Sequence, residues 1–307
     1  MSASKRWATA TLTALSFLAL VAAQDASVQK VQDDEVVKVE VDLVTVNISV
    51  TDGGKRPVRG LRAADFLVSD EGREVSLEFF EGQGPSSIVF VVDTSTSMKH
   101  DKWKKLTTGL KKFLTRAREE NDYTLIAFSD RPRLVAESVD AEALWQSALS
   151  LEPSGNTALY DAVLLGLEAL GRAPRRHKAL VLLTDGQDNS SRARLEDVQR
   201  EVLAHRATVY AVGITLYGFD DDAVLDVELK GREILNRLAV ATGGLAFFPV
   251  PDEIRGVLDG INSDLSGQYT LGYYAPDKSP GWRNIKVSLS PTPRPFRLRY
   301  PERYLKR

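Results

Sequence analysis

The sequence contains no cysteine among its 307 residues and only three histidines. The absence of cysteine excludes disulfides, thiolate-bound metals, thiol nucleophiles and a lipid attached to an N-terminal cysteine. His100, His177 and His205 lie far apart along the chain, so a zinc hydrolase is not expected. Charge of one sign is also lacking, with 40 basic and 42 acidic side chains, which argues against nucleic acid as a partner.

Long apolar runs are missing as well, except at the amino terminus. Lys5 and Arg6 precede an uncharged stretch, residues 7–23, that is rich in Ala and Leu and ends in small residues. This is the pattern of a secretory signal peptide with cleavage between Ala23 and Gln24. A membrane anchor is the less favoured alternative, because a short stretch containing several Thr makes a poor span. We expect an exported protein, periplasmic or secreted, with no membrane span in the mature chain.

The rest of the chain has the composition of a globular protein, with 43% apolar and 27% charged residues. Over residues 86–266, apolar runs of strand length alternate with segments of helical periodicity. The first run, Ile88–Val92, is unbroken, as expected of a strand that is buried on both faces of a parallel sheet. The alternation predicts an α/β domain with a doubly wound, mostly parallel, Rossmann-like sheet.

Short segments of β character lie on both sides of this domain. Residues 24–35 are polar and acidic and are predicted to be a flexible leader, and residues 36–85 form a β segment with a linker. Residues 267–307 contain three predicted strands. Neither flank is large enough to be stable alone, so we expect residues 36–81 to pair with the C-terminal segment in a small β-sandwich-like domain, with the α/β domain inserted between them.

Polar side chains follow the predicted strands at the edge where sites form in such sheets. Asp93, Ser95 and Ser97 follow the first strand, Asp185 follows a later strand, and Thr157 precedes a predicted helix between them. Carboxylate and hydroxyl oxygens suit Mg²⁺, Mn²⁺ or Ca²⁺ better than zinc or copper. Taken singly, these residues have plain structural explanations, since Asp93 and Thr157 could simply cap helices.

Together, these residues resemble the von Willebrand factor type A (VWA) domain over roughly residues 86–266. The resemblance rests on Asp93-x-Ser95-x-Ser97, on Thr157 in Gly-Asn-Thr-Ala-Leu-Tyr-Asp, and on Asp185 in Thr-Asp-Gly. It implies the metal-ion-dependent adhesion site (MIDAS) of that family. By this resemblance, the three hydroxyls would coordinate the ion directly or nearly so, and the two carboxylates would act largely through bound water.

The flanks also carry a resemblance, which rests on a short motif. Val58-x-Gly60-Leu61-x-x-x-Asp65-Phe66 is similar to the secreted bacterial VWFA-related family of acidobacterial type.

The donor set predicts binding of a partner rather than catalysis. Two carboxylates and three neutral hydroxyls leave a divalent ion, most readily Mg²⁺, electrophilic enough to take an Asp or Glu carboxylate from a protein ligand. Two alternatives stay open. One is a phosphatase-like, metal-dependent hydrolase, although such enzymes place a second Asp where this chain has Ser95. The other is a scaffold in which the metal is purely structural.

Several further residues have both a functional and a plain interpretation. Asp161 and Asp188 lie close in sequence to the ligand segments and could orient the ligands through hydrogen bonds without binding the metal themselves. His100 is expected to be an exposed residue near the start of the first helix. Tyr273-Tyr274 and Trp282 could form a carbohydrate platform, or could simply pack within the β domain.

The segment Thr215–Gly231 is predicted to be a long strand-to-helix connection at the edge that carries the metal site. Tyr217 and Phe219 could form a rim that contacts the partner. The acidic residues that follow, from Asp220 to Glu228, could hold a second cation or form a solvated loop. Their charge predicts a partner whose carboxylate lies within a neutral or basic patch.

Overall fold

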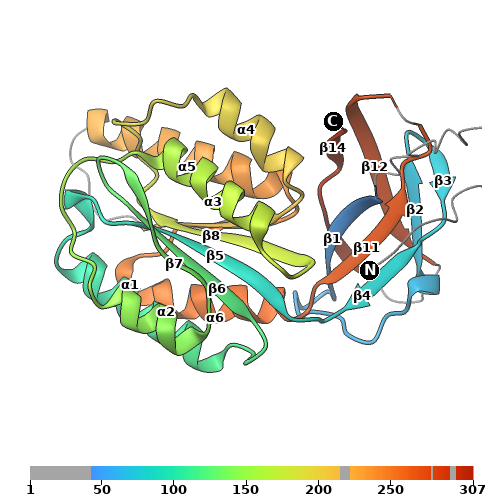
Figure 1. The fold of residues 1–307 in the computed structure, drawn as a ribbon, viewed down its shortest axis with the longest axis horizontal. Coiled ribbons are helices and arrows are strands. Elements are labelled where there is room, and N and C mark those ends of the chain that lie inside the picture. Colours follow the sequence, from blue (N-terminus) through green and yellow to red (C-terminus); the bar gives the residue numbers. More distant parts are fainter. Residues whose placement is uncertain (1–42, 215–221, 278, 291–294, 307) are drawn as a thin grey trace, which may run out of the picture. The chain divides into compact units, whose positions relative to one another are not determined.

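The computed structural model describes residues 43–214, 222–277, 279–290 and 295–306, with the side chains of residues 222–224 excepted. The predicted signal peptide and leader therefore lie outside the described residues. A six-stranded sheet has the strand order β10-β9-β8-β5-β6-β7. Figure 1 labels its strands β5 to β8. All neighbours in it are parallel except β7, which pairs antiparallel with β6 at one edge. Its strands are β5 (Ser86–Asp93), β6 (Asp122–Phe128), β7 (Pro132–Val139), β8 (His177–Thr184), β9 (Thr208–Gly213) and β10 (Leu245–Phe247).

Helices cover both faces of this sheet because its central strand is apolar at every position except its ends. Ile88, Phe90 and Val92 face one core, and Val89 and Val91 face the other. The first core contains side chains of α1 (Asp101–Arg116), α2 (Ala141–Ala148) and α6 (Ile254–Leu265). The second contains side chains of α3 (Leu159–Arg172), α4 (Leu195–Ala204) and α5 (Asp222–Ala241).

The flanking segments build two four-stranded sheets, with the orders β13-β1-β11-β4 and β14-β12-β2-β3. β1 pairs with β11 and β2 pairs with β12, so each sheet combines strands from both ends of the chain. Apolar side chains from the two sheets, such as Ile48, Phe66 and Leu271, form a shared core. The expected fold class is confirmed. The strands are β1 (Leu43–Thr51), β2 (Phe66–Asp70), β3 (Arg73–Val75), β4 (Phe79–Gly82), β11 (Tyr269–Tyr274), β12 (Gly281–Leu289), β13 (Arg297–Arg299) and β14 (Arg303–Lys306).

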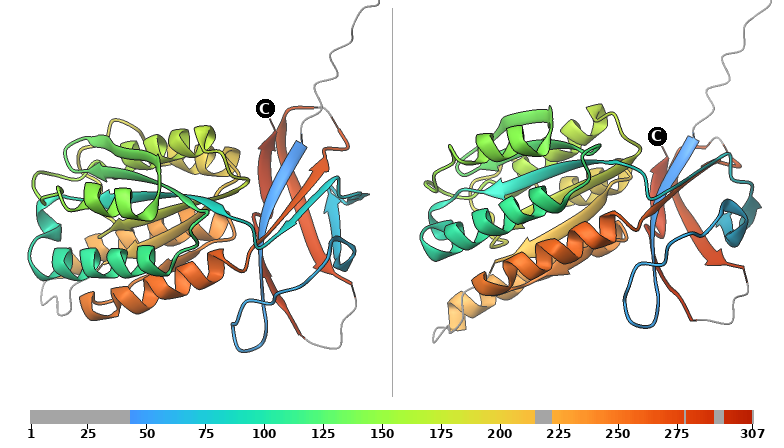
Figure 2. Two further views of the ribbon diagram at one scale, coloured as in Figure 1. Left: turned by 60° about the horizontal axis from the view of Figure 1, so that its bottom comes forward. Right: turned by 90° about the horizontal axis from the view of Figure 1, so that it is seen from below.

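The β domain contacts the α/β domain at the amino ends of the parallel strands (Figure 2). Nδ2 of Asn47 donates to the carbonyl oxygen of Lys178, 3.4 Å away, near the start of β8. The Thr270 hydroxyl lies 2.9 Å from Nδ1 of His177, at the first residue of that strand. The carboxyl ends of the strands, which carry the candidate site residues, therefore lie at the opposite edge of the sheet.

One predicted boundary and one predicted number of strands are wrong. The connection after β9 does not extend to Gly231, because α5 begins at Asp222 and runs through that glycine. Ion pairs one helical turn apart favour a helix here, and they join Asp226 to Lys230, Glu228 to Arg232 and Glu233 to Arg237. The C-terminal segment has four strands rather than three, since the four-residue β14 is too short to give a period-two pattern.

A buried ion pair between Asp70 and Arg283 links β2 to β12 in the second sheet of the β domain. Asp70 is fully buried and accepts hydrogen bonds of 2.8 Å from Nε of Arg283 and from the hydroxyl of Tyr304. The Tyr273 hydroxyl donates to the same carboxylate at 3.0 Å. Tyr273 is therefore a core residue, and only Tyr274 and Trp282 of the three aromatic residues are exposed. Within the described ranges, no helix is long and apolar enough to cross a membrane.

Candidate metal centre

The first loop of the site begins where β5 ends, at Asp93. This carboxylate is fully buried, and its Oδ1 accepts a 2.8 Å hydrogen bond from the backbone amide of Ser95. Its Oδ2 accepts a 2.7 Å hydrogen bond from the hydroxyl of Thr184, at the end of the neighbouring β8. A turn of 3₁₀ helix follows and brings the hydroxyl oxygens of Ser95 and Ser97 to 2.9 Å from each other. Ser95 is buried and Ser97 is exposed, so the loop is open to solvent on the side of Ser97.

Two further loops are hydrogen-bonded to the first or to each other. The backbone amide of Thr96 donates to the carbonyl oxygen of Gly155 at 3.0 Å, which joins the first loop to the segment that carries Thr157. The backbone amide of Thr157 donates to Oδ1 of Asn189, and the amide of Asn189 donates back to the carbonyl oxygen of Thr157, both at 2.9 Å. Asn189 lies in the loop that begins with Asp185 at the end of β8. The structure thus brings together the loops that carry all five sequence-predicted ligands.

In the absence of a cation, it is unfavourable for the carboxylates of Asp93 and Asp185 to be charged at the same time. Burial, and then the nearby charge of Asp185, raise the pKa of Asp93 to about 6. Oδ1 of Asp185 is buried and has no hydrogen-bond partner in the described part of the chain. A buried carboxylate oxygen without a partner is costly, and a hard cation is the group that such oxygens prefer. The oxygen-only donor set and this oxygen both fit a divalent metal ion.

One residue of the cluster was missed by the sequence reasoning. Lys102, on the first turn of α1, is only 7% exposed, and its Nζ lies 3.7 Å from Oδ2 of Asp185. A signal was available, because Lys102 shares a helix face with Leu106, Gly109 and Phe113, all of them buried. A lysine on the apolar face of a helix next to a predicted metal loop is a candidate for interaction with that loop.

Asp161 and Asp188 hold the loop after β8 against the start of α3. Oδ1 of Asp161 accepts hydrogen bonds from the backbone amides of Arg192 and Ala193, at 3.2 and 2.9 Å. Oδ1 of Asp188 accepts a hydrogen bond from the backbone amide of Tyr160, on the first turn of α3, at 3.3 Å. These contacts fix the loop backbone, and a supporting role toward a metal stays a prediction.

The predicted rim residues Tyr217 and Phe219 lie outside the described residues, as do Asp220 and Asp221. Of the remaining acidic residues, Asp226 is exposed and forms an ion pair with Lys230 on α5. Glu228 is largely buried and forms an ion pair with Arg232, with the closest N–O distance 3.0 Å. These two acidic side chains therefore belong to a helix rather than to a solvated loop.

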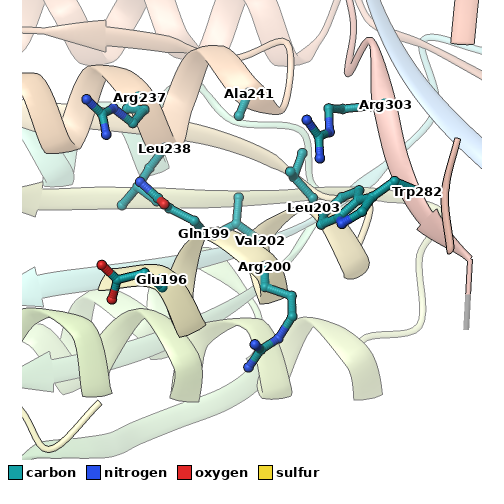
Figure 3. Close-up of a pocket in the computed structure, with 10 residues that line it drawn as sticks. All are labelled: Glu196, Gln199, Arg200, Val202, Leu203, Arg237, Leu238, Ala241, Trp282 and Arg303. Carbon is teal, nitrogen blue, oxygen red and sulfur yellow. The ribbon is translucent and has the colours of Figure 1, made fainter. Parts of the chain in front are cut away.

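Other candidate features are not part of the cluster. His100 is exposed at the N-cap of α1, as expected. A pocket of about 370 Å³ is lined by α4, α5 and the β domain, with Leu203, Leu238, Trp282 and Arg303 among its walls (Figure 3). The Arg303 guanidinium lies 4.2 Å from the centre of the Trp282 ring. None of the five candidate ligands lines this pocket. Within the described ranges, no group of three or more His, Cys, Asp or Glu residues could hold a metal, so the hydroxyls are needed to complete a donor set.

Comparisons with known proteins agree with this architecture. The family model of the von Willebrand factor type A domain matches residues 87–252. Inter-alpha-trypsin inhibitor heavy chain H4 of Sus scrofa is 27% identical over 176 residues, which cover 53% of this chain and 18% of that protein. Heavy chain H3 of Rattus norvegicus is 31% identical over 143 residues, which cover 41% of this chain and 16% of that protein. The matches thus span about a fifth or less of these relatives' length.

A solved structure described as von Willebrand factor type A from Catenulispora acidiphila is similar with a TM-score of 0.50 and 12% identity. The similarity covers 87% of this chain and 73% of that chain, and at this identity it shows the fold alone. The family match extends over more than half of the chain and includes the loops of Asp93, Thr157 and Asp185. The chain therefore belongs to the von Willebrand factor type A domain family.

Proposed function

We propose that this protein is an exported, non-catalytic binding module that holds a divalent cation and uses it to capture a carboxylate of a protein partner. VWA domains are typically protein-binding modules, and the coarse function follows from the family match. The observation that carries the finer proposal is the buried, unpartnered Oδ1 of Asp185 close to the Asp93 carboxylate, where three loops are hydrogen-bonded together.

The proposed ligands are Asp93, Ser95, Ser97, Thr157 and Asp185. We propose Mg²⁺ as the ion, with Mn²⁺ or Ca²⁺ as close alternatives, because the donors are all oxygen. When bound, the ion supplies an electrophilic position for an incoming carboxylate oxygen.

The protein's own residues then have separate roles. The hydrogen bonds from the Ser95 amide and the Thr184 hydroxyl orient the Asp93 carboxylate and keep it from turning out of the site. The exposed Ser97 marks the open side of the loop, where a partner carboxylate would approach. The β domain contacts the other end of the sheet, so a partner could reach this side without displacing it.

Metal binding is tested by titration calorimetry of the full chain with MgCl₂ and MnCl₂. We expect one site in the wild type and none in Asp185→Asn, which keeps the shape of the side chain and removes its charge. Asp101→Asn is the matched control, since Asp101 is an exposed carboxylate at the start of α1. Equal binding by wild type and Asp185→Asn would refute the ligand assignment.

Carboxylate capture is tested with an immobilised array of short peptides that each contain a single Asp, beside the same peptides with Asn. We expect the protein to be retained by a subset of the Asp peptides in Mg²⁺ and released by a chelator. Retention that is the same on Asp and Asn peptides would contradict the proposal. Release of phosphate from p-nitrophenyl phosphate, lost in Asp93→Asn, would instead favour the hydrolase.

A further inference from the structure

Lys102 is the residue near the proposed metal site for which the donor set gives no role. Its side chain is 8% exposed, as is that of Asp185, and the two groups are 3.7 Å apart. The stem of Lys102 lies on the buried face of α1, so the ammonium reaches the site from inside the domain rather than from solvent. A buried lysine needs a compensating negative charge, and Asp185 supplies it.

The formal charges around the site differ from those of the five ligands alone. Asp93 and Asp185 together balance a divalent cation, which would leave the loaded site neutral. The Lys102 ammonium adds one positive charge. Neighbouring charged residues such as Lys99 and Asp101 are exposed to water, which screens them, whereas Lys102 is shielded from it.

We propose that Lys102 keeps the loaded site cationic, so that binding of the metal and binding of an anionic ligand reinforce each other. This inference rests on the proposed function and adds the reason why an anion would be selected. The ammonium repels the cation and competes with it for Asp185, which weakens metal binding in the absence of an anion. A carboxylate at the open position brings the charge to zero, so each ligand raises the affinity for the other by the same factor.

The first test measures metal affinity in the absence of a carboxylate ligand. The full chain is titrated with MnCl₂ in chloride buffer, as wild type, as Lys102→Met and as Lys105→Met. Lys102→Met removes the charge and keeps an unbranched side chain. Lys105 is on the same helix but pairs with Asp252 at the surface, which makes it the matched control. We expect Lys102→Met to bind Mn²⁺ about tenfold or more tightly than the wild type, and Lys105→Met to be unchanged.

The second test measures the coupling itself. Replacing chloride by acetate at constant ionic strength should tighten Mn²⁺ binding several-fold more in the wild type and in Lys102→Arg than in Lys102→Met, where the metal ion alone attracts the acetate. Circular dichroism in chelator checks the fold, and Lys102→Gln replaces Lys102→Met if the latter is unfolded. In chelator, the folded neutral variant should also melt at a lower temperature than the wild type, because Asp185 loses its counter-charge.

The outcomes separate this inference from the proposed function. If Lys102→Met binds Mn²⁺ with the same affinity as the wild type, or shows the same acetate effect, the proposed role of Lys102 is overturned. Binding by the wild type would still support the metal site. Absence of Mn²⁺ binding in all variants would overturn both.

Discussion

Asp93→Asn should stabilise the metal-free protein while abolishing metal binding. The buried carboxylate has its pKa raised from 3.8 to about 6, first by burial and then by Asp185. Each pKa unit corresponds to about 1.4 kcal/mol, so the ionised group destabilises the native state by about 3 kcal/mol above pH 7. Asn carries no charge, and it keeps an oxygen for the Ser95 amide and offers a donor to the Thr184 hydroxyl. We therefore expect its free energy of unfolding to exceed that of the wild type by about 1–3 kcal/mol at pH 8 in chelator.

The sign of the pH dependence gives a second check on the same variant. Because the native pKa is above the unfolded one, the native state holds this proton more tightly, and the penalty in the wild type fades as the pH falls through 6. The difference between the two proteins should shrink to about 0.5 kcal/mol at pH 4.

The assay is urea unfolding followed by circular dichroism at several pH values, with and without saturating MgCl₂. Magnesium should stabilise the wild type and leave Asp93→Asn unchanged. Asp101→Asn, which alters an exposed carboxylate, should change the stability by less than about 1 kcal/mol at every pH. The reasoning would be refuted by an Asp93→Asn protein that is less stable than the wild type at pH 8 in chelator.

Three other predictions concern the junction and the β domain. Burial lowers the pKa of His177 to about 4, so as the pH falls the unfolded state takes up the imidazole proton before the native state does. Between pH 7 and pH 5, the free energy of unfolding of the wild type should therefore fall by about 2 kcal/mol more than that of His177→Asn, as measured by urea titration. Asp70→Ala should lower the free energy of unfolding by about 3–5 kcal/mol in the same assay, because Arg283 loses its buried partner. Asp277, which is half-exposed, also pairs with Arg283, and Asp277→Ala should lower it by less than about 1 kcal/mol. Deletion of residues 267–307 removes the strands that pair with β1 and β2, and should give aggregated protein in size-exclusion chromatography; a soluble monomer would argue against the need for the shared sandwich.

Much of the fold could be predicted because local sequence patterns report directly on burial. The unbroken run Ile88–Val92 predicted a strand covered on both faces, and each of its residues is buried. The alternation of apolar and polar residues in the flanks predicted strands with one buried face. The helix α5 was placed too late because Gly231 was taken as part of a loop. In the structure, a side chain at position 231 would meet the backbone of Gly186, so the glycine serves close packing rather than a turn.

The candidate ligands could be chosen from the sequence, because residues that follow parallel strands must emerge at one edge of the sheet. This argument covers Asp93 and Asp185, whereas Thr157 lies between α2 and α3 and was added by the resemblance to the von Willebrand factor type A domain. Tertiary structure alone decided which groups surround them. The Thr184 hydroxyl bonds to Asp93 only because β8 lies beside β5, and Lys102 meets Asp185 only because α1 packs over the same strands. Strand and helix periodicities are local properties of the chain, and the periodicity of α1 already indicated that Lys102 is buried. The partner of Lys102, and the hydrogen bonds of the site, depend on contacts between segments that are distant in sequence.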